Sequence, residues 1–441
     1  MRFTISEIAR ATSGTSIGTE VTVSGVGIDS RSVGVGDLFV PLIAERDGHQ
    51  FIDAAIAGGA AAYLSSRTPP GDHPAVMVDD TTNALAAIGR FARSRLRGEV
   101  IGITGSVGKT SVKDLATAVF GSVYSTHSNP ASFNNEIGVP LTLANTPEGT
   151  EVVIQEMGAR GMGDISHLCG IAVPTAAVVT VVAAAHTSEF SSLDEIAIAK
   201  GELVEAVGSS GFVVLNRDDP HVWGMAERTE ARVVGFGSGA DVRALDVQLD
   251  DALRPHFTLT TPDGSSPVLL ELRGKHQVAN ALAAAAAGYA VGIDTDAIAA
   301  GLGNARGSAW RMEVTTRDDG VVVINDSYNA NPTSMRAAFD ALAGHAARRR
   351  FAVLGTMAEL GDTSVSDHRS IGQEAIERGF TVITVSEDSY DVGQAVTDPS
   401  GAIAVLGELG EGDVVLVKAS RAAGLERVAQ LLLTRSGARH R

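Results

Sequence analysis

The sequence predicts an α/β protein of three domains, each built around its own sheet. Its 441 residues exceed the roughly 250–300 that a single hydrophobic core usually serves, so several domains are expected. From residue 98 onward, short apolar runs typical of buried strands alternate with segments of helical period, which favours mainly parallel sheets covered by helices. This alternation restarts near residue 311. We therefore predict domains at residues 1–97, 98–310 and 311–441.

Composition narrows the class of protein. The chain has 35 basic and 52 acidic residues, and its net charge of −17 disfavours nucleic acid or an anionic membrane surface as a partner. Its only cysteine, Cys169, excludes an intramolecular disulfide and a cysteine metal cluster. The first residues lack the apolar core of a signal peptide, and the longest apolar run, 171–185, is too short to span a bilayer. We predict a cytoplasmic protein without membrane insertion.

The N-terminal segment, residues 1–97, predicts a small α/β domain. Strand-like runs at Val21–Val23 and Asp37–Leu42 precede a helical segment over about 81–96. Between the two runs, Asp29–Arg31 places a hydroxyl and a guanidinium after a predicted strand, where an anionic ligand could bind. The residues alone favour a solvated turn at this position.

A glycine-rich loop follows the first strand of the central segment. Glu99–Thr104 is typical of a buried strand, and Gly105–Ser111, G-S-V-G-K-T-S, leads into a segment of helical period. Backbone N–H groups of such a loop can surround an anion, Lys109 adds a mobile positive charge, and the Thr110 hydroxyl suits magnesium. The common phosphate loop has a glycine where this chain has Ile103, so the loop is one residue tighter, and a chance glycine-rich turn is the alternative. We predict a P-loop ATPase-like domain whose nucleotide contacts are Gly105, Ser106, Val107, Gly108, Lys109, Thr110 and Ser111.

Further segments extend the central domain. Val152–Glu156 and Ala176–Val182 are strand-like, Asp194–Val207 is helical, and 278–290 predicts an alanine-rich helix. Ala244–Leu272 predicts an antiparallel insertion. Ligands of a parallel sheet bind at the carboxyl ends of its strands, so polar residues at those ends are the functional candidates.

Three side chains near these ends or in the following helix could carry chemistry. Glu156 ends an apolar strand where a second magnesium ligand would face the phosphate loop, although an acidic residue held by a helix cap is the alternative. His186 follows the next strand and could reach a metal or phosphate, but a lone histidine there is more often structural. Lys200 lies on a predicted helix, where composition alone favours a solvated tip.

The C-terminal segment predicts a Rossmann-like domain. Strand-like Val321–Ile324 and Phe351–Leu354 flank a predicted helix over Pro332–Leu342. The loop Asn325–Pro332, N-D-S-Y-N-A-N-P, joins the first strand to this helix, and Asn331 suits its N-cap. Three asparagines and a tyrosine are costly to bury unless hydrogen-bonded, so this loop favours a functional role over a structural turn.

Taken together, these motifs resemble the ATP-dependent Mur ligases of peptidoglycan synthesis. The resemblance spans nearly the whole chain and includes the tight phosphate loop and the three-domain order. Within the family, the chain is most similar to the branch that adds D-alanyl-D-alanine to UDP-N-acetylmuramoyl-tripeptide. The motifs that carry this similarity are F-N-N-E-I-G-V-P-L-T-L (133–143), E-M-G-A (156–159), A-K-G-E-L (199–203), L-N-x-D-D-P (215–220), S-Y-N-A-N-P (327–332) and V-L-G-x-M-x-E-L-G (353–361).

The resemblance implies a role for each candidate residue. Lys109 would bind the transferred phosphate, Thr110 and Glu156 would hold one Mg²⁺, and His186 with a carbamylated Lys200 would hold a second. Asn280 would meet the adenine of ATP, while Arg311 and Asp326 would reach the phosphates and ribose from the third domain. Ser30 and Arg31 would hold the uridine nucleotide. The other implied substrate contacts are Asn134, Asn135, Tyr328, Asn329 and Asn331.

The same resemblance predicts the substrates and the oligomeric state. Two alternative functions remain to be compared with it. The expected substrates are UDP-N-acetylmuramoyl-tripeptide, D-alanyl-D-alanine and ATP, handled by a monomer. A neighbouring ligase, above all the tripeptide-forming one, is the alternative, although that enzyme usually has a D-N-P-R type motif in its third domain. Folate polyglutamylating enzymes carry D-G-A-H-N-P at the loop where this chain has N-D-S-Y-N-A-N-P, residues 325–332. A nucleotide switch would need a guanine-selecting N-K-x-D motif, which the sequence lacks. The sequence leaves the third residue of the tripeptide open.

Overall fold

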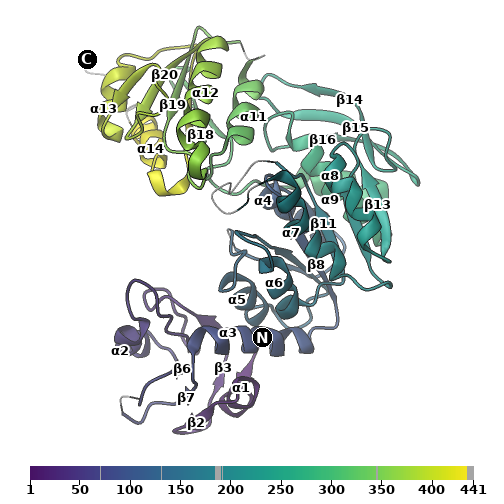
Figure 1. The fold of residues 1–441 in the computed structure, drawn as a ribbon, viewed down its shortest axis with the longest axis vertical. Helices are drawn as coiled ribbons and strands as arrows, with labels where there is room; N and C mark the ends of the chain where they lie inside the picture. Colours follow the sequence, from purple (N-terminus) through teal and green to yellow (C-terminus); the bar gives the residue numbers. More distant parts are fainter. Residues whose placement is uncertain (70, 131, 184–189, 191, 344–345, 435–441) are drawn as a thin grey trace.

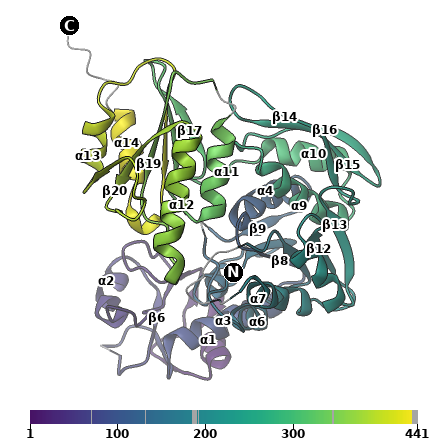
Figure 2. The same ribbon diagram turned by 45° about the horizontal axis from the view of Figure 1, so that its top comes forward.

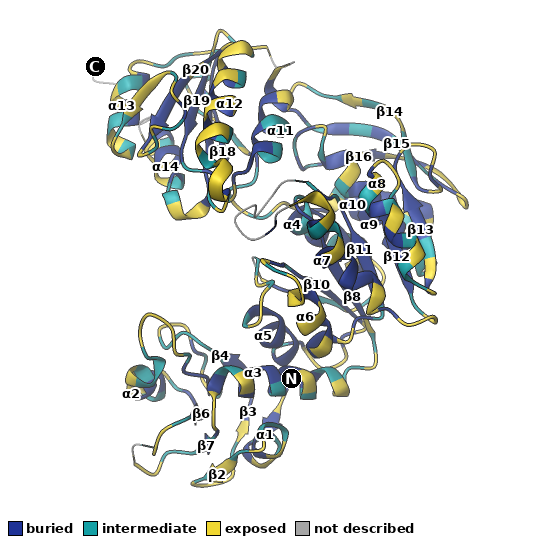
Figure 3. Ribbon diagram, viewed as in Figure 1, coloured by how far each residue is buried: buried dark blue, intermediate teal, exposed yellow. Residues whose placement is uncertain are grey.

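The computed structural model describes residues 1–434 except 70, 131, 184–189, 191 and 344–345. It is an α/β protein of three domains, as predicted, and Figure 1 shows them following one another along an arc from the N-terminal domain through the central domain to the C-terminal domain. The strands of the central and C-terminal sheets are mostly buried, whereas the outer faces of their helices are exposed (Figure 3). Each sheet therefore forms the centre of a layered domain.

The N-terminal domain has a small mixed sheet of strand order β2-β7-β6-β5-β4 beside the separate pair β1-β3. The helix α1 was not among the predicted elements, since the first predicted element was the strand-like run Val21–Val23. A local capping box explains it, because Thr4 Oγ1 accepts from Glu7 N–H and Glu7 Oε2 accepts from Thr4 N–H. The elements are β1 (Phe3–Thr4), α1 (Ile5–Thr12), β2 (Thr15–Ile17), β3 (Thr22–Val23), β4 (Val26–Gly27), β5 (Leu38–Phe39), α2 (Ile52–Ala57), β6 (Ala62–Ser65), β7 (Ala75–Met77) and α3 (Thr81–Arg95).

The central domain is built on a fully parallel six-stranded sheet of order β13-β12-β11-β8-β10-β9. The predicted antiparallel insertion is present as the sheet β14-β15-β16, whose apolar side chains share a core with α4, α9 and α10. The elements are β8 (Glu99–Thr104), α4 (Lys109–Gly121), β9 (Thr126–Ser128), α5 (Gly138–Ala144), β10 (Val152–Glu156), α6 (Asp164–Ala172), β11 (Ala176–Val179), α7 (Leu193–Glu205), β12 (Phe212–Asn216), α8 (Pro220–Trp223), β13 (Arg232–Phe236), β14 (Arg243–Leu249), β15 (Pro255–Thr261), β16 (Gly264–Leu269), α9 (Gln277–Ala290) and α10 (Thr295–Asn304).

The N-terminal and central domains share one hydrophobic core. Helix α3 packs against α5 and α6, and a Cβ added at Gly89 of α3 would lie 2.5 Å from Pro140 Cβ of α5. Only a glycine allows the two helices to approach this closely. The joint between these domains is therefore a packed interface as well as a chain connection.

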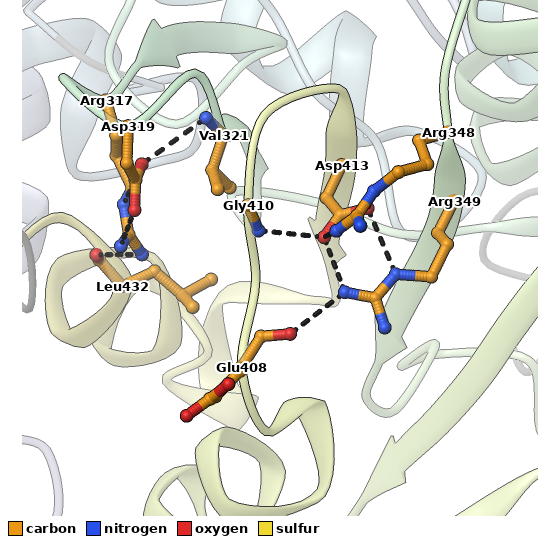
Figure 4. A network of polar contacts seen from close by, with 9 residues as sticks. All are labelled: Arg317, Asp319, Val321, Arg348, Arg349, Glu408, Gly410, Asp413 and Leu432. Atoms are coloured by element: carbon orange, nitrogen blue, oxygen red, sulfur yellow. Dashed lines mark hydrogen bonds and ion pairs between the residues drawn. The ribbon is translucent and has the colours of Figure 1, made fainter.

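The C-terminal domain has a six-stranded sheet of order β17-β18-β22-β19-β20-β21, parallel except for the edge strand β17. At the start of β22, the buried carboxylate of Asp413 accepts hydrogen bonds from Arg348, Arg349 and Gly410 N–H (Figure 4). The elements are β17 (Glu313–Thr316), β18 (Val322–Asp326), α11 (Pro332–Ala343), β19 (Arg349–Leu354), α12 (Ser364–Glu377), β20 (Phe380–Val385), β21 (Gln394–Val396), α13 (Pro399–Leu406), β22 (Asp413–Lys418) and α14 (Glu426–Thr434).

The carboxyl ends of strands from two sheets meet near one another. In the central sheet, Glu156 of β10 pairs in register with Ile103 of β8, two residues before the phosphate loop begins at Gly105. In the C-terminal sheet, Asp326 of β18 pairs with Lys418 of β22. In Figure 1 and Figure 2, α11 lies on the side of the C-terminal domain that faces the central domain. Glu156, Asp326 and Lys418 line one cavity, so polar side chains of both domains share a common space.

Candidate active site

The phosphate loop has the backbone geometry that its two glycines permit. Gly105 has φ 145° and Gly108 has φ 86°, both in the region that side chains disfavour. A Cβ at Gly105 would lie 1.9 Å from Thr180 Oγ1, and one at Gly108 would lie 2.4 Å from Asn280 Oδ1. Both glycines are therefore required by backbone conformation and by close neighbours. Asn280 is also placed directly at the start of α4, where a phosphate would bind.

Lys109 begins α4 and folds back over this loop. Its Nζ donates to Gly105 O at 2.6 Å and to Ser106 O at 3.3 Å. Burial lowers the pKa of its ammonium group, which Glu156 partly offsets. The ammonium is thus held by two carbonyls of the loop, which a phosphate could replace as its partner.

The Thr110 hydroxyl and the Glu156 carboxylate form one buried polar unit. Thr110 Oγ1 donates to Glu156 Oε2 at 2.9 Å, and it accepts from Arg311 Nη2 at 2.9 Å. Asn134 Nδ2 donates to the other carboxylate oxygen at 2.7 Å, and Asn129 Oδ1 accepts from Glu156 N–H. The carboxylate is 1% exposed and fixed in orientation by these bonds.

This unit fits a magnesium ion. Its two adjacent donors are hard oxygen atoms, which Mg²⁺ prefers, and Mg²⁺ usually takes only one or two protein carboxylates beside phosphate and water. Across the described parts of the chain, no group of three or more His, Cys, Asp or Glu side chains gathers as a closed metal cage. The donor set therefore suits an ion shared with a nucleotide.

Lys200 lies on α7 and is only 2% exposed, so the solvated tip favoured by composition is wrong. Among the described residues, none forms a hydrogen bond or ion pair with its ammonium group. Burial and the nearby Lys109 charge lower the pKa of Lys200 to about 7. An amine with that pKa is largely neutral at mildly alkaline pH and can act as a nucleophile.

The C-terminal domain contributes a second polar cluster. Asp326 accepts from Lys418 Nζ at 2.5 Å and from Met312 N–H at 3.1 Å. Lys418 also donates to Asn329 O at 2.9 Å, which ties the N-D-S-Y-N-A-N-P loop to β22. The Arg311 guanidinium stacks 4.4 Å from the ring centroid of Tyr328. Arg311 therefore bridges the two domains, from Tyr328 to the Thr110 hydroxyl.

A cavity of about 900 Å³ joins these parts. Ile28, immediately before the Asp29–Arg31 turn, lines it from the N-terminal domain. Most of the predicted site residues line the cavity, as follows: Ser106, Val107, Gly108, Lys109, Thr110, Ser111, Asn134, Asn135, Glu156, Asn280, Arg311, Asp326, Tyr328 and Asn329. The structure thus brings together residues that lie up to 223 positions apart, from Ser106 to Asn329.

Several predicted residues do not line this cavity. Arg31 is mostly exposed and forms a bidentate ion pair with Asp29, while Ser30 lies in the same turn. The Asn331 side chain accepts from Ser334 N–H at 2.9 Å, so it caps α11. Their predicted substrate contacts stay predictions. His186 lies outside the described residues, and Gly105 and Lys200 are not among the residues that line the cavity.

Sequence reasoning missed several residues of the cavity. Lys418 ends strand β22, Arg421 follows it, and His276 precedes α9, yet none was predicted. Lys418 and Arg421 carried a usable signal, since V-V-L-V-K-A-S-R ends an apolar strand with two cations at the edge where ligands bind. His276 had no such signal, because it lies in the turn before a helix and its burial depends on the packed domains.

Comparisons with protein families cover the three domains in turn. Residues 22–89 match the model described as Mur ligase family, catalytic domain. Residues 103–288 match the Mur ligase middle domain, and residues 310–421 match the Mur ligase, glutamate ligase domain.

Named relatives carry one activity in common. The chain is 42% identical to the UDP-N-acetylmuramoyl-tripeptide--D-alanyl-D-alanine ligase of Mycobacterium tuberculosis (strain CDC 1551 / Oshkosh), over 92% of each chain. It is 37% identical to the ligase of that name from Escherichia coli (strain K12), over 97% of this chain and 98% of the relative. The ligase from Bacillus subtilis (strain 168) is 35% identical over 94% of each.

Solved structures agree with this similarity. Crystal structure I of MurF from Acinetobacter baumannii superposes with a TM-score of 0.90 at 28% identity, covering 98% of this chain and 99% of that one. MurF ligase from Thermotoga maritima in complex with ADP gives a TM-score of 0.83 at 29% identity, covering 95% and 99%. The similarity therefore extends over all three domains.

Proposed function

The chain belongs to the Mur ligase family, and from this membership we propose that it joins D-alanyl-D-alanine to UDP-N-acetylmuramoyl-tripeptide at the expense of ATP. The products are UDP-N-acetylmuramoyl-pentapeptide, ADP and phosphate, which makes the protein an ATP-dependent ligase of peptidoglycan precursor synthesis. The relatives that carry this activity are 35–42% identical over nearly their whole length. The observation that best supports the proposal is the Thr110–Glu156 pair beneath Lys109, met by Arg311 from the C-terminal domain.

The chemistry requires activation of a carboxylate. The terminal carboxylate of the tripeptide attacks the γ-phosphate of ATP, the bond from that phosphorus to the bridging oxygen breaks, and an acyl phosphate and ADP result. The dipeptide amine then attacks the acyl carbon, and phosphate leaves from the tetrahedral intermediate as the amine loses its proton. Lys109 and Arg311 would neutralise charge that gathers on the phosphates. Positioning and charge neutralisation therefore account for most of the catalysis.

Thr110 and Glu156 would hold a magnesium ion beside the phosphates. Bound there, magnesium supplies positive charge that screens the repulsion between the substrate carboxylate and ATP. Asn134 keeps the Glu156 carboxylate oriented toward the loop. Asn280, in contact with the loop at Gly108, would lie against the nucleotide, and Asp326 would meet its ribose.

Lys200 would act as a carbamate. Its neutral amine attacks carbon dioxide, a nitrogen–carbon bond forms, and one proton is released, which leaves a carboxylate in place of an amine. Its burial without a polar partner among the described residues supports this modification, and so does its lowered pKa of about 7. The new carboxylate, together with His186, would hold a second magnesium ion.

The remaining assignments complete the proposal. Domain boundaries at 97/98 and 310/311 fall between the three main sheets, and Ser30 and Arg31 would hold the uridine nucleotide beside Ile28. Asn135, Tyr328, Asn329 and Asn331 would contact or position substrate. None of the described helices has the length and apolar character needed to cross a bilayer. We propose a cytoplasmic monomer.

One assay tests the proposed function. Purified protein is incubated with ATP and Mg²⁺, with UDP-N-acetylmuramoyl-tripeptide and D-alanyl-D-alanine added singly and together. Phosphate release and a pentapeptide product identified by mass spectrometry should appear only when both are present. Phosphate release without the dipeptide, or product formation from a dipeptide precursor and a single diamino acid, would reject the proposal in favour of another activity. Running lysine- and diaminopimelate-containing tripeptides in parallel identifies the preferred third residue.

A further inference from the structure

The cationic side chains that line the cavity differ in whether they have polar partners. Five Lys and Arg side chains line it among the described residues, and four of them have polar partners. Three of these partnerships are given above, and the fourth is an ion pair of 3.9 Å between Arg160 and Glu359. The fifth cation, Arg421, forms no hydrogen bond or ion pair through its guanidinium with any residue that the structure describes. The four with partners are Lys109, Arg160, Arg311 and Lys418.

Arg421 is an exposed residue whose guanidinium contacts two aromatic rings. Its guanidinium carbon lies 5.6 Å from the ring centroid of Tyr328 and 5.9 Å from that of Trp310. Stacking engages the flat face of a guanidinium and leaves its N–H donors at the edge, where they match a carboxylate in bidentate fashion. The N–H donors of Arg421 are thus available to an anion, and no described anionic side chain pairs with them.

The loop that carries Arg421 is joined to a neighbouring loop of the same sheet. Ser420 N–H donates to Thr356 O, and Ser420 Oγ accepts from Ala358 N–H, both at 2.9 Å. Glu359 follows in the chain with φ 63°, an uncommon conformation for a residue with a side chain, and it lines the same cavity. The two loops therefore present a positive and a negative side chain at fixed places.

We propose that Arg421 binds the carboxylate of the incoming D-alanyl-D-alanine, with its ammonium end oriented toward Glu359. The inference rests on the proposed function and deepens it. The dipeptide is a small zwitterion whose carboxylate remains unreacted throughout the reaction, so it needs a permanent cationic partner. The carboxylate of the tripeptide that reacts must instead reach the phosphates at Lys109, in the central domain. Arg421 stands on the C-terminal domain and does not contact that loop.

The first test measures each substrate separately. Arg421→Met should raise the KM for D-alanyl-D-alanine about 10- to 100-fold, the range expected when a charge-assisted hydrogen-bond pair is lost. The KM values for ATP and UDP-N-acetylmuramoyl-tripeptide should change less than about threefold. Arg427→Met is the matched control, because Arg427 is an exposed arginine six residues further on that does not line the cavity. Thermal unfolding of both variants verifies that they fold.

The second test removes the charge from the substrate instead. Wild-type protein should use D-alanyl-D-alaninamide, which lacks the carboxylate, about 10- to 100-fold less efficiently than D-alanyl-D-alanine. Arg421→Met should use the two about equally, and Arg421→Lys should restore part of the preference. A variant that keeps the full preference, or that raises the KM of the tripeptide instead, overturns this inference alone. If the wild-type protein makes no pentapeptide at all, the proposed function fails, and the inference fails with it.

Discussion

Lys200 and Asp413 are both charged groups buried by their domains, but among the described residues only Asp413 has polar partners. The Asp413 side chain is 0% exposed and accepts hydrogen bonds from two arginines and a backbone N–H (Figure 4). The Lys200 side chain lies in the central domain, 2% exposed, without a hydrogen bond or ion pair to any described residue. A buried charge with partners contributes to the fold, whereas one without them points to a function.

Electrostatics separate the two sites in the same way. Hydrogen bonds from Arg349 and then Arg348 hold the pKa of Asp413 well below its usual range, so the carboxylate stays ionised. Burial, followed by repulsion from Lys109, lowers the pKa of Lys200 to about 7, so its charge is easily lost. The surroundings of Asp413 stabilise its charge, and those of Lys200 oppose it.

Replacing Lys200 should produce the largest effect. We expect Lys200→Ala to lower kcat by about 10³-fold or more, because the carbamate and its magnesium ion would be lost from the reacting phosphates. Unfolding by urea should show stability equal to or above that of wild type, since the variant removes an uncompensated charge. Full activity in Lys200→Ala would exclude any catalytic role for this lysine.

Replacing Asp413 should reverse this pattern. Asp413→Asn removes the charge that two arginines share, and we expect a loss of about 2–3 kcal/mol in the free energy of unfolding. Initial rates at 25 °C should stay close to wild type, because the network lies at the amino end of β22, opposite the cavity. Urea titration and steady-state kinetics on the same preparation verify both. A large fall in kcat with unchanged stability would contradict the comparison.

The pH dependence of stability gives a further check on Asp413. Its pKa is lower in the folded than in the unfolded chain, so its contribution is complete above the ordinary carboxyl value of about 3.9. That contribution is lost as pH falls below this value toward the folded pKa. Wild-type protein should therefore lose more stability than Asp413→Asn between about pH 5 and pH 2.5. Equal losses in the two proteins would show that the pair is not formed.

A smaller effect should appear when carbon dioxide is removed. With a Lys200 pKa of about 7, the neutral amine fraction rises roughly from a tenth to nine tenths between pH 6 and pH 8. Protein depleted of carbon dioxide should regain activity on bicarbonate addition several-fold faster at pH 8 than at pH 6. A carbamate signal in ¹³C NMR with labelled bicarbonate should appear in wild type and be absent from Lys200→Ala. Activity that never depends on bicarbonate would reject the modification.

The two sites also show how much the sequence could predict. The strand Glu99–Thr104 and the glycine loop after it were predicted with correct bounds, because a strand, a tight loop and a helix start are local features. Without the family resemblance, the sequence predicted that Lys200 is a solvent-exposed side chain. The spacing of apolar residues in α7 does not show which side of that helix is buried. Only the family resemblance selected it for function.

Contacts between distant segments were beyond sequence reasoning. Asp413 meets Arg348 and Arg349 because β22 and β19 pair in register, and no local pattern specifies that pairing. The proposed role of Arg421 depends on its contacts with Tyr328 and Trp310. These contacts form only once the strands of the C-terminal sheet are assembled. The missed residues are therefore those whose role depends on tertiary neighbours.

The smallest effect should come from removing a single arginine of the Asp413 network. The Arg348 and Arg349 side chains are 56% and 43% exposed, so either can leave while the other still donates to the carboxylate. We expect Arg349→Ala to lower Tm by no more than about 2 °C, since half-exposed ion pairs contribute little each. Calorimetry should show that the double variant Arg348→Ala, Arg349→Ala loses more than the two single losses combined, because only then is the buried carboxylate left without a cation. Strictly additive losses would mean that the two arginines act independently of each other, and would contradict their shared role at Asp413.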